Sequence, residues 1–246
     1  MNTNGYQLED RMTRIVKYDI LRIIASFSIV LLHVSASYWS VVDLHGKEFL
    51  VMTIYNSMTR FAVPVFFMLS GLFLVSPRRE NPMAGKRILK LVMLFYVWSA
   101  FYAFQRIAVD TLKGDFSMEV WRAALERFIF GHVHMWFLQI LCGFYLLIPV
   151  ARQISAKKEI LRYYLLLWII FRFLIPTLTD AFQMATFQAR IDSLGLDVLV
   201  GNFGYFLMGY YLNITDIRKE ARLLIYALGI VSLFLTPFLT LHDCIK

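Results

Sequence analysis

The sequence predicts an all-α fold: a polytopic transmembrane helix bundle of about seven spans with a cytoplasmic N-terminus. The first observation is composition. The 246 residues are 59% hydrophobic and 17% charged, with a mean hydropathy of +0.61, whereas soluble domains carry about 25% charged residues. The second is that apolar runs long enough to cross a bilayer recur along the chain. The third is that Lys and Arg gather beside the ends of these runs.

The predicted spans follow one another with short connections. The first is 21 residues long, and about 20 are needed to cross a bilayer as a helix. The fourth and sixth are shorter, which tilting or local thinning of the bilayer accommodates. The segment Val120–Phe130 has a mixed pattern that favours an interfacial amphipathic helix. The spans are Tyr18–Tyr38, Met52–Val75, Ile88–Val109, Met135–Val150, Leu161–Leu178, Val198–Leu212 and Leu223–Leu241.

Basic residues give the orientation. Of the 25 Lys and Arg, 15 lie in segments predicted to be cytoplasmic, six in outer segments, and four within or at the edges of spans. By the positive-inside rule, residues 1–17 are a cytoplasmic segment and residues 18–246 a single transmembrane domain, which we expect in a cell inner membrane. The net charge of +8 reflects this orientation. We therefore expect the lipid bilayer, and no nucleic acid, as a partner.

The first span carries ionisable residues. Arg22 and His33 are eleven residues apart, which puts them on one helix face about 16.5 Å apart along the axis. Such residues inside a span usually mark a functional site. We predict that His33 acts as a general base and that Arg22 binds donor or orients the site, paired with Asp19 three residues earlier. The structural alternatives are an interhelical hydrogen bond for His33 and interfacial positions for the other two.

The second span contains Arg60 and Pro64. The proline removes a backbone N–H and so predicts a bend in the helix. The small pair Ser70–Gly71 lets another helix or a ligand approach the backbone, and helix packing is the favoured interpretation.

Three cations begin the third span on its cytoplasmic side: Lys86, Arg87 and Lys90. Arg87 and Lys90 share a helix face because they are three residues apart. A phosphate-bearing ligand is the natural partner of such a group. The alternative is that these cations only set the orientation of the chain.

Two histidines, His132 and His134, stand at the outer entrance of the fourth span. Residues at i and i+2 do not face the same way on a helix, and no third residue has zinc-ligand spacing, so we expect no metal. His134 is predicted to reach a polar cavity. The neighbouring Trp136 is typical of a membrane interface.

Several of these motifs, in this order, resemble the integral-membrane acyltransferase type 3 family. The family's Arg-then-ten-then-His pattern is similar to YDILRIIASFSIVLLH, through Arg22 and His33. FAVPVFFMLSG resembles its second-span signature, and KRILK its Arg-x-x-Arg pair, with Lys90 in place of the second Arg. HMWFLQILCGFYLLIPV resembles its His-x-Trp-Phe-Leu span, and GYFLMGYYL a later Gly-rich one. Within the family the chain looks most like bacterial O-acetyltransferases of surface glycans such as enterobacterial common antigen.

The resemblance implies an O-acyltransferase that moves acetyl from acetyl-CoA to a hydroxyl of a surface polysaccharide or lipid-linked sugar. The cations Lys86, Arg87 and Lys90 would bind the phosphates of the donor, and the acyl-CoA arm would run past Arg22 to His33. Substrate binding would involve the remaining polar and aromatic residues of the motifs, namely Asp19, Arg60, Ser70, His134 and Trp136. Family members usually have about ten spans, so the chain is expected to lack the last ones.

Two other functions remain open from the residues alone. Intramembrane Arg and His also mark substrate paths, as in a transporter or flippase of a lipid-linked sugar. The third reading is a non-catalytic accessory membrane subunit, for which an oligomer or a partner subunit is expected.

Overall fold

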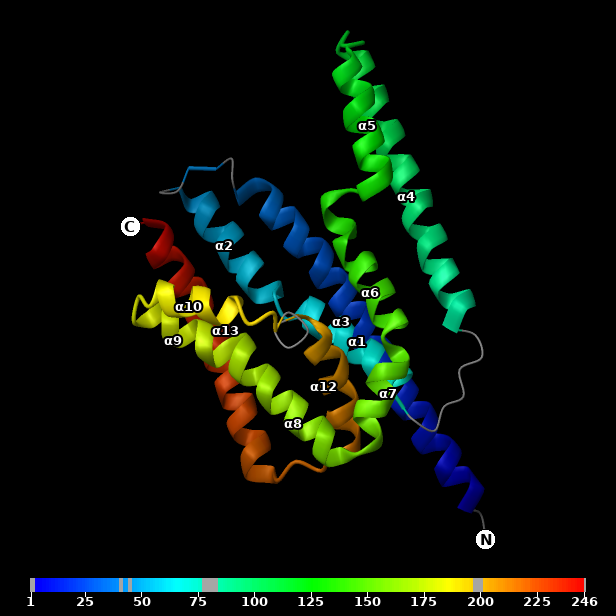
Figure 1. Cartoon of the computed structure of the whole chain (residues 1–246), viewed down its shortest axis with the longest axis vertical. Coiled ribbons are helices and arrows are strands. Elements are labelled where there is room, and N and C mark those ends of the chain that lie inside the picture. The colour runs from blue at the N-terminus through cyan, green and yellow to red at the C-terminus, as the bar shows by residue number, and fades with distance from the viewer. Residues whose placement is uncertain (1–2, 40–41, 44–45, 77–83, 197–200, 246) are drawn as a thin grey trace. The chain divides into compact units, whose positions relative to one another are not determined.

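The computed structural model describes residues 3–39, 42–43, 46–76, 84–196 and 201–245, which form helices joined by short connections (Figure 1). No strand occurs within these ranges, and the predicted all-α fold is confirmed. The chain divides into two compact units. The first unit is Met1–Val75 with Lys157–Lys246, and the second is Ser76–Ala156.

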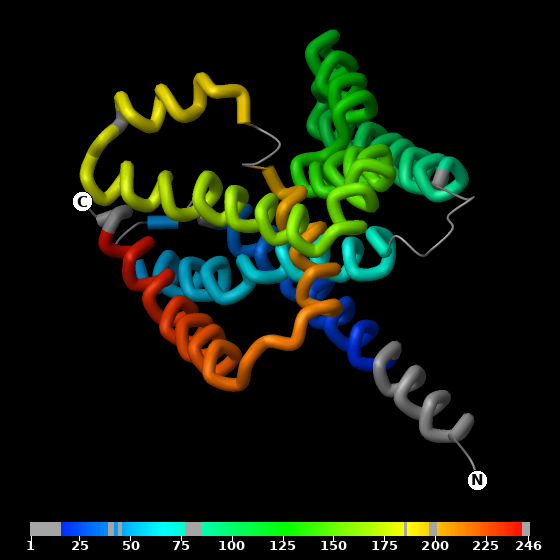
Figure 2. Tube along the Cα trace, turned by 60° about the horizontal axis from the view of Figure 1, so that its bottom comes forward, coloured from blue at the N-terminus to red at the C-terminus, as the bar shows by residue number. Residues whose placement is uncertain are grey.

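The first unit is organised around α1, which is one continuous helix (Figure 1). Both α2 and α3 contact α1, α12 contacts α3 and α8, and α13 lies along α2 (Figure 2). Small residues on α1, Ala25, Ser28 and Ser35, are buried, as is usual where membrane helices pack closely. The elements are α1 (Thr3–Trp39), α2 (Lys47–Thr59), α3 (Ala62–Leu74), α8 (Lys158–Ile169), a π-helical stretch (Ile170–Leu174), α9 (Ile175–Ala181), α10 (Ala185–Asp192), α12 (Phe203–Ile214) and α13 (Lys219–Ile245).

The second predicted span is interrupted between α2 and α3. Pro64 has no N–H to donate to the carbonyl of Arg60, so the helical hydrogen-bond ladder cannot continue there. The next donor, Val65 N, bonds the carbonyl oxygen of Phe61 at 3.0 Å. The helix is therefore interrupted next to Pro64, as the proline predicts: α2 ends at Thr59, Arg60 follows it, and α3 begins at Ala62.

Two glycines allow α3 and α12 to touch along their backbones. A Cβ at Gly71 would lie 1.6 Å from the carbonyl oxygen of Phe206, and one at Gly209 would lie 1.9 Å from that of Met68. Each helix thus presents a glycine to the backbone of the other, an arrangement favoured between membrane helices. The packing interpretation of the Ser70–Gly71 pair is confirmed for Gly71.

The second unit is a hairpin of α4 and α5 followed by α6 and α7. Phe95 of α4 forms a small core with Met135 and Leu138. Gly131 ends α5 with a φ of 79°, and a Cβ there would lie 2.8 Å from the Phe95 ring. Only glycine readily combines this backbone conformation with such a close approach. The elements are α4 (Ala84–Leu112), α5 (Met118–Phe130), a 3₁₀ turn (Val133–Met135), α6 (Trp136–Leu146) and α7 (Ile148–Ala156).

Six stretches among the described residues are long and apolar enough to span a membrane. Six of the seven predicted spans overlap them. The remaining one, Val198–Leu212, differs. Its first residues lie outside the described ranges, and the rest is α12, which has 12 residues and buries Phe206 and Leu207 completely.

The segment Val120–Phe130, predicted as interfacial, lies in α5 along α4 and is part of the apolar stretch Met118–Leu146. The six stretches are Val16–Tyr38, Lys47–Leu74, Gly85–Leu112, Met118–Leu146, Lys158–Ala181 and Lys219–His242.

Lipid-facing surfaces are recognisable by exposed apolar side chains. On α1, Phe27 is 70% exposed and Val30 is 60% exposed. None of the side chains described on α13, residues 219–242, is buried. Apolar surface on this scale is not stable in water and is typical of contact with a bilayer. The chain is therefore a multi-pass membrane protein.

Candidate active site

The N-terminal end of the first predicted span holds a charged and aromatic group. Arg22 Nη1 donates to Asp19 Oδ1 at 2.9 Å, which confirms that the two residues pair. The guanidinium of Arg22 also lies 4.6 Å from the centre of the Phe73 ring on α3, within cation–π range. Tyr18 packs edge-on against the same ring. Arg22 is thus held in place by α1 and α3 together.

His33 lies on α1 and is half-buried. At 100° per residue, Arg22 and His33 are about 20° apart around the helix, and both flank the face that buries Ala25. His33 is six residues before the end of α1, and Thr53 is six residues after the start of α2. Since the two helices form an antiparallel hairpin, both residues lie about 9 Å from its loop, which puts them at the same depth.

The face of α2 at this depth is polar, which the sequence interpretation did not identify. Thr53, Asn56 and Ser57 are all buried. Arg60 follows on the same face and donates from Nε to Asn56 Oδ1 at 3.1 Å. The hydroxyl of Ser57 has no hydrogen-bond partner among the residues that the structure describes. The spacing of these residues, i, i+3, i+4 and i+7, is a helical face that the sequence signal could have revealed.

The hydroxyl of Ser70 is hydrogen-bonded within its own helix. It donates to the carbonyl oxygen of Phe66 at 2.9 Å within α3. A serine bonded back to its own helix is common in membrane helices and needs no ligand.

The cationic group of the second unit stands in the first turns of α4. Lys86 and Lys90 are exposed and Arg87 is half-buried. No carboxylate among the described residues pairs with Lys86, Arg87 or Lys90. Three such cations within two helical turns fit a phosphate-bearing group.

Two histidines and a tyrosine form a hydrogen-bonded chain in the second unit. His134 Nε2 is 2.8 Å from the hydroxyl of Tyr102 on α4, and His134 Nδ1 is 2.9 Å from His132 Nδ1. The expectation that the two histidines face apart was wrong. Its premise was a helix, but α5 ends at Gly131 and His132 has an extended backbone before the 3₁₀ turn, so the two rings meet. Trp136 begins α6 with 37% of its surface exposed.

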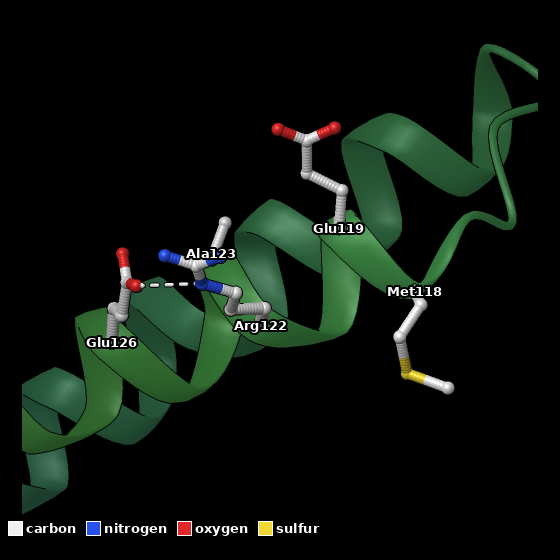
Figure 3. Close-up of a pocket in the computed structure, with 5 residues that line it drawn as sticks. All are labelled: Met118, Glu119, Arg122, Ala123 and Glu126. Atoms are coloured by element: carbon white, nitrogen blue, oxygen red, sulfur yellow. Dashed lines mark hydrogen bonds and ion pairs between the residues drawn. The ribbon is translucent and has the colours of Figure 1, made fainter.

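His132 lines a polar pocket of about 240 Å³ between α4 and α5. Its other lining residues are Gln105, Arg106, Val109, Asp110, Lys113 and Arg127. A second hollow, on the outer surface of α5, is lined by Met118, Glu119, Arg122, Ala123 and Glu126 (Figure 3). There Arg122 and Glu126 pair with each other at 3.1 Å on the exposed face of one helix (Figure 3).

The structure brings some of the predicted site residues together. Asp19 and Arg22 are paired, and His134 is hydrogen-bonded to both His132 and Tyr102. His33 belongs to the first unit and the cationic group of α4 to the second, so the predicted route of the acyl donor between them stays a prediction.

Comparisons with known proteins place the chain in a family. A family model described as an acyltransferase domain matches residues 15–244, from α1 to α13. No curated protein and no solved structure matches the chain. The match covers the Arg22–His33 face, the cationic group of α4 and the histidine chain. The protein belongs to the acyltransferase type 3 family and is a multi-pass membrane acyltransferase.

Proposed function

We propose that the protein transfers an acetyl group from acetyl-CoA to a hydroxyl of a surface polysaccharide or lipid-linked sugar, in the inner membrane of a cell. The observation that carries the proposal is the pair on α1: an anchored cation, Arg22, and an imidazole, His33, on one face about 16.5 Å apart. Placing ionisable side chains inside a membrane span costs free energy, and residues of this kind usually belong to a functional site.

His33 acts as the general base. It takes the proton of the acceptor hydroxyl, whose oxygen then bonds to the thioester carbonyl carbon. The carbon–sulfur bond breaks, and the leaving thiolate of CoA takes up a proton. Base assistance of this kind is worth about 10²–10⁴ in rate. A transient acyl-histidine that the acceptor then attacks uses the same residue.

Arg22 orients the donor. Because Asp19 and Phe73 already hold its guanidinium, the remaining N–H groups meet a phosphate or carbonyl of the donor without much further ordering. Arg22 therefore contributes through position as well as charge.

The cations Lys86, Arg87 and Lys90 bind the phosphates of acetyl-CoA. Their charges have no partner among the described carboxylates, which suits an anionic ligand. Arg87 can form a bidentate pair with phosphate, whereas Lys90 acts as a point charge. On the acceptor side we assign Asp19, Arg60, Ser70, His134 and Trp136, of which Arg60 is exposed next to the end of α2.

The test uses purified protein in vesicles with radiolabelled acetyl-CoA and candidate glycans. His33→Ala is expected to lower acetyl transfer by at least about 10²-fold while it folds and inserts normally. His242→Ala, at the far end of α13, is the matched control and should keep activity. A His33→Ala protein with the wild-type rate would refute the mechanism.

A second variant tests the donor site. Arg87→Ala should raise the apparent KM for acetyl-CoA with little change in kcat, because it removes binding rather than chemistry. Lys219→Ala, at the start of α13, removes another cation from the predicted cytoplasmic side and should leave KM unchanged. Equal KM values in the wild type and Arg87→Ala would contradict the phosphate role.

A further inference from the structure

The pocket between α4 and α5 carries an excess of positive charge. Three cations line it, Arg106, Lys113 and Arg127, against one carboxylate, Asp110. Asp110 is buried and forms an ion pair with Arg106. Lys113 and Arg127 have no carboxylate partner among the described residues. Two like charges beside one small pocket repel each other, and an anion between them would offset that repulsion.

Asp115 lies outside the pocket and does not cancel this charge. Its carboxylate accepts a hydrogen bond from Ser117 N at 2.9 Å. That backbone N–H is the main reason why the pKa of Asp115 is below its usual value, with a smaller contribution from Arg106. Even with Asp115 counted, cations outnumber anions around the pocket.

The histidine chain places His132 at the pocket wall. When Tyr102 donates its hydroxyl proton to His134 Nε2, His134 donates from Nδ1 to His132 Nδ1, and a neutral His132 carries its proton on Nε2. In the reverse arrangement His132 donates from Nδ1 to His134, and its Nε2 is an acceptor. His134 lies behind His132 and acts as a positioning residue for it.

The size of the pocket sets the size of the ligand. Its volume is about 240 Å³, and one water takes up about 30 Å³ in the liquid. The pocket is therefore large enough for a carboxylate or phosphate group with part of the sugar that bears it.

Its position separates it from the proposed donor site. Lys90 and Arg106 are both on α4, 16 residues apart, which is about 24 Å along the helix. That distance approaches the ~30 Å thickness of a bilayer's hydrocarbon core. One phosphate group cannot contact both ends of α4, so an anion in this pocket would be distinct from the one proposed to bind Lys86, Arg87 and Lys90.

We propose that this pocket binds an anionic group of the acyl acceptor, a carboxylate or a phosphate, and so selects an acidic glycan or a phosphate-linked sugar. The anion lies between Arg127, Lys113 and the Arg106–Asp110 pair, beside His132. The assignment to the acceptor rests on the proposed acetyl transfer, whereas anion binding does not depend on it.

The experiment measures binding by titration calorimetry on the full chain in nanodiscs of phosphatidylcholine, a lipid without net charge. Glucuronate and inorganic pyrophosphate are the two anionic probes, and glucose is the neutral control. We expect at least one anion to bind and glucose not to bind. If glucose binds as well as both anions, or if neither anion binds, the proposal is overturned.

Variants locate the site. Arg127→Gln should raise the Kd of the anion about tenfold or more, since it removes a charge-assisted hydrogen bond. Arg127→Lys should recover part of the affinity. Arg122→Gln removes a cation of the same helix that faces away from the pocket and already pairs with Glu126, and it should change nothing. Equal losses in Arg122→Gln and Arg127→Gln would indicate non-specific attraction and overturn the site.

A crossed comparison separates acceptor from donor. Arg87→Gln should weaken acetyl-CoA binding and leave the anion probe unaffected, and Arg127→Gln should do the reverse. If Arg127→Gln weakens acetyl-CoA binding instead, the pocket belongs to the donor and the inference fails although acetyl transfer can still stand. Nanodiscs that contain phosphatidylglycerol test whether the bound anion is a lipid headgroup. If this lipid abolishes binding of the probe, the pocket binds a lipid headgroup and the acceptor role is overturned.

Discussion

Alanine at Gly71 or Gly209 is expected to force α3 and α12 apart. The new Cβ atoms would lie 1.6 Å from Phe206 O and 1.9 Å from Met68 O, while ordinary contact begins at 3.4 Å. The differences, 1.8 Å and 1.5 Å, are the displacements that each substitution requires. Both obstructing atoms are helix backbone, which cannot rotate away as a flexible side chain can.

The cost follows from how steeply contact energy falls with distance. A gap of about 0.5–1 Å already loses a quarter to a half of it, so a displacement above 1 Å removes most of the packing between the two helices. Loss of one large buried side chain costs about 3–5 kcal/mol. We expect each substitution to lower the free energy of unfolding by about 3 kcal/mol or more, which outweighs the gain of ~1 kcal/mol that alanine brings to a helix.

The assay is thermal unfolding of the purified protein in one detergent, followed by intrinsic tryptophan fluorescence. Gly143→Ala in α6 and Gly229→Ala in α13 are matched controls, because no atom lies within 4 Å of a Cβ at either position. The controls should unfold at or above the wild-type Tm, and Gly71→Ala and Gly209→Ala roughly 6 °C or more below it. If all four variants unfold at the same Tm, the backbone contact between α3 and α12 does not exist.

Three further predictions concern other contacts. Gly131→Ala should lower the Tm more than Gly114→Ala, because both have positive φ but only the former meets an aromatic ring; equal losses would show that backbone conformation alone matters. Lys90→Arg should lower the KM for acetyl-CoA several-fold by allowing a bidentate contact with phosphate, and an unchanged KM in steady-state assays would argue against donor contact there. Phe73→Leu should cost about 0.5–2 kcal/mol through the lost cation–π contact with Arg22, with a raised KM; calorimetry and kinetics identical to wild type would dismiss that contact.

Local sequence patterns were sufficient for the features that depend on one helix. The 21-residue apolar run predicts a spanning helix, and α1 is continuous through it. The pairing of Asp19 with Arg22 follows from i, i+3 geometry and is confirmed. The interruption near Pro64 follows from the missing N–H of proline. In each case the physical cause lies within a few residues of its effect.

Features that depend on a partner element were not predictable in this way. Hydropathy does not show how much of an apolar segment its neighbours cover, and α12 buries Phe206 and Leu207 completely. A glycine is required at position 209 only because the backbone of Met68 lies against it. His132 and His134 meet because Gly131 ends the preceding helix with a positive φ, which a helical spacing rule cannot anticipate.

Polar residues inside the spans of the first unit differ in where their hydrogen-bond partners lie. This difference distinguishes residues that serve helix packing from residues of the proposed site. Ser35, Thr59 and Ser70 donate to carbonyl oxygens of their own helices at 2.9, 2.7 and 2.9 Å, so their burial costs little free energy whether or not a ligand is bound. A guanidinium or an imidazole cannot be satisfied by its own helix backbone in this way. Arg22 therefore pairs with Asp19 on its own helix and with the Phe73 ring on α3. The side chains that carry specific chemistry are those whose stability depends on neighbouring elements, which is why the proposed site includes His33 and Arg22 as its central residues and Ser70 only at its edge.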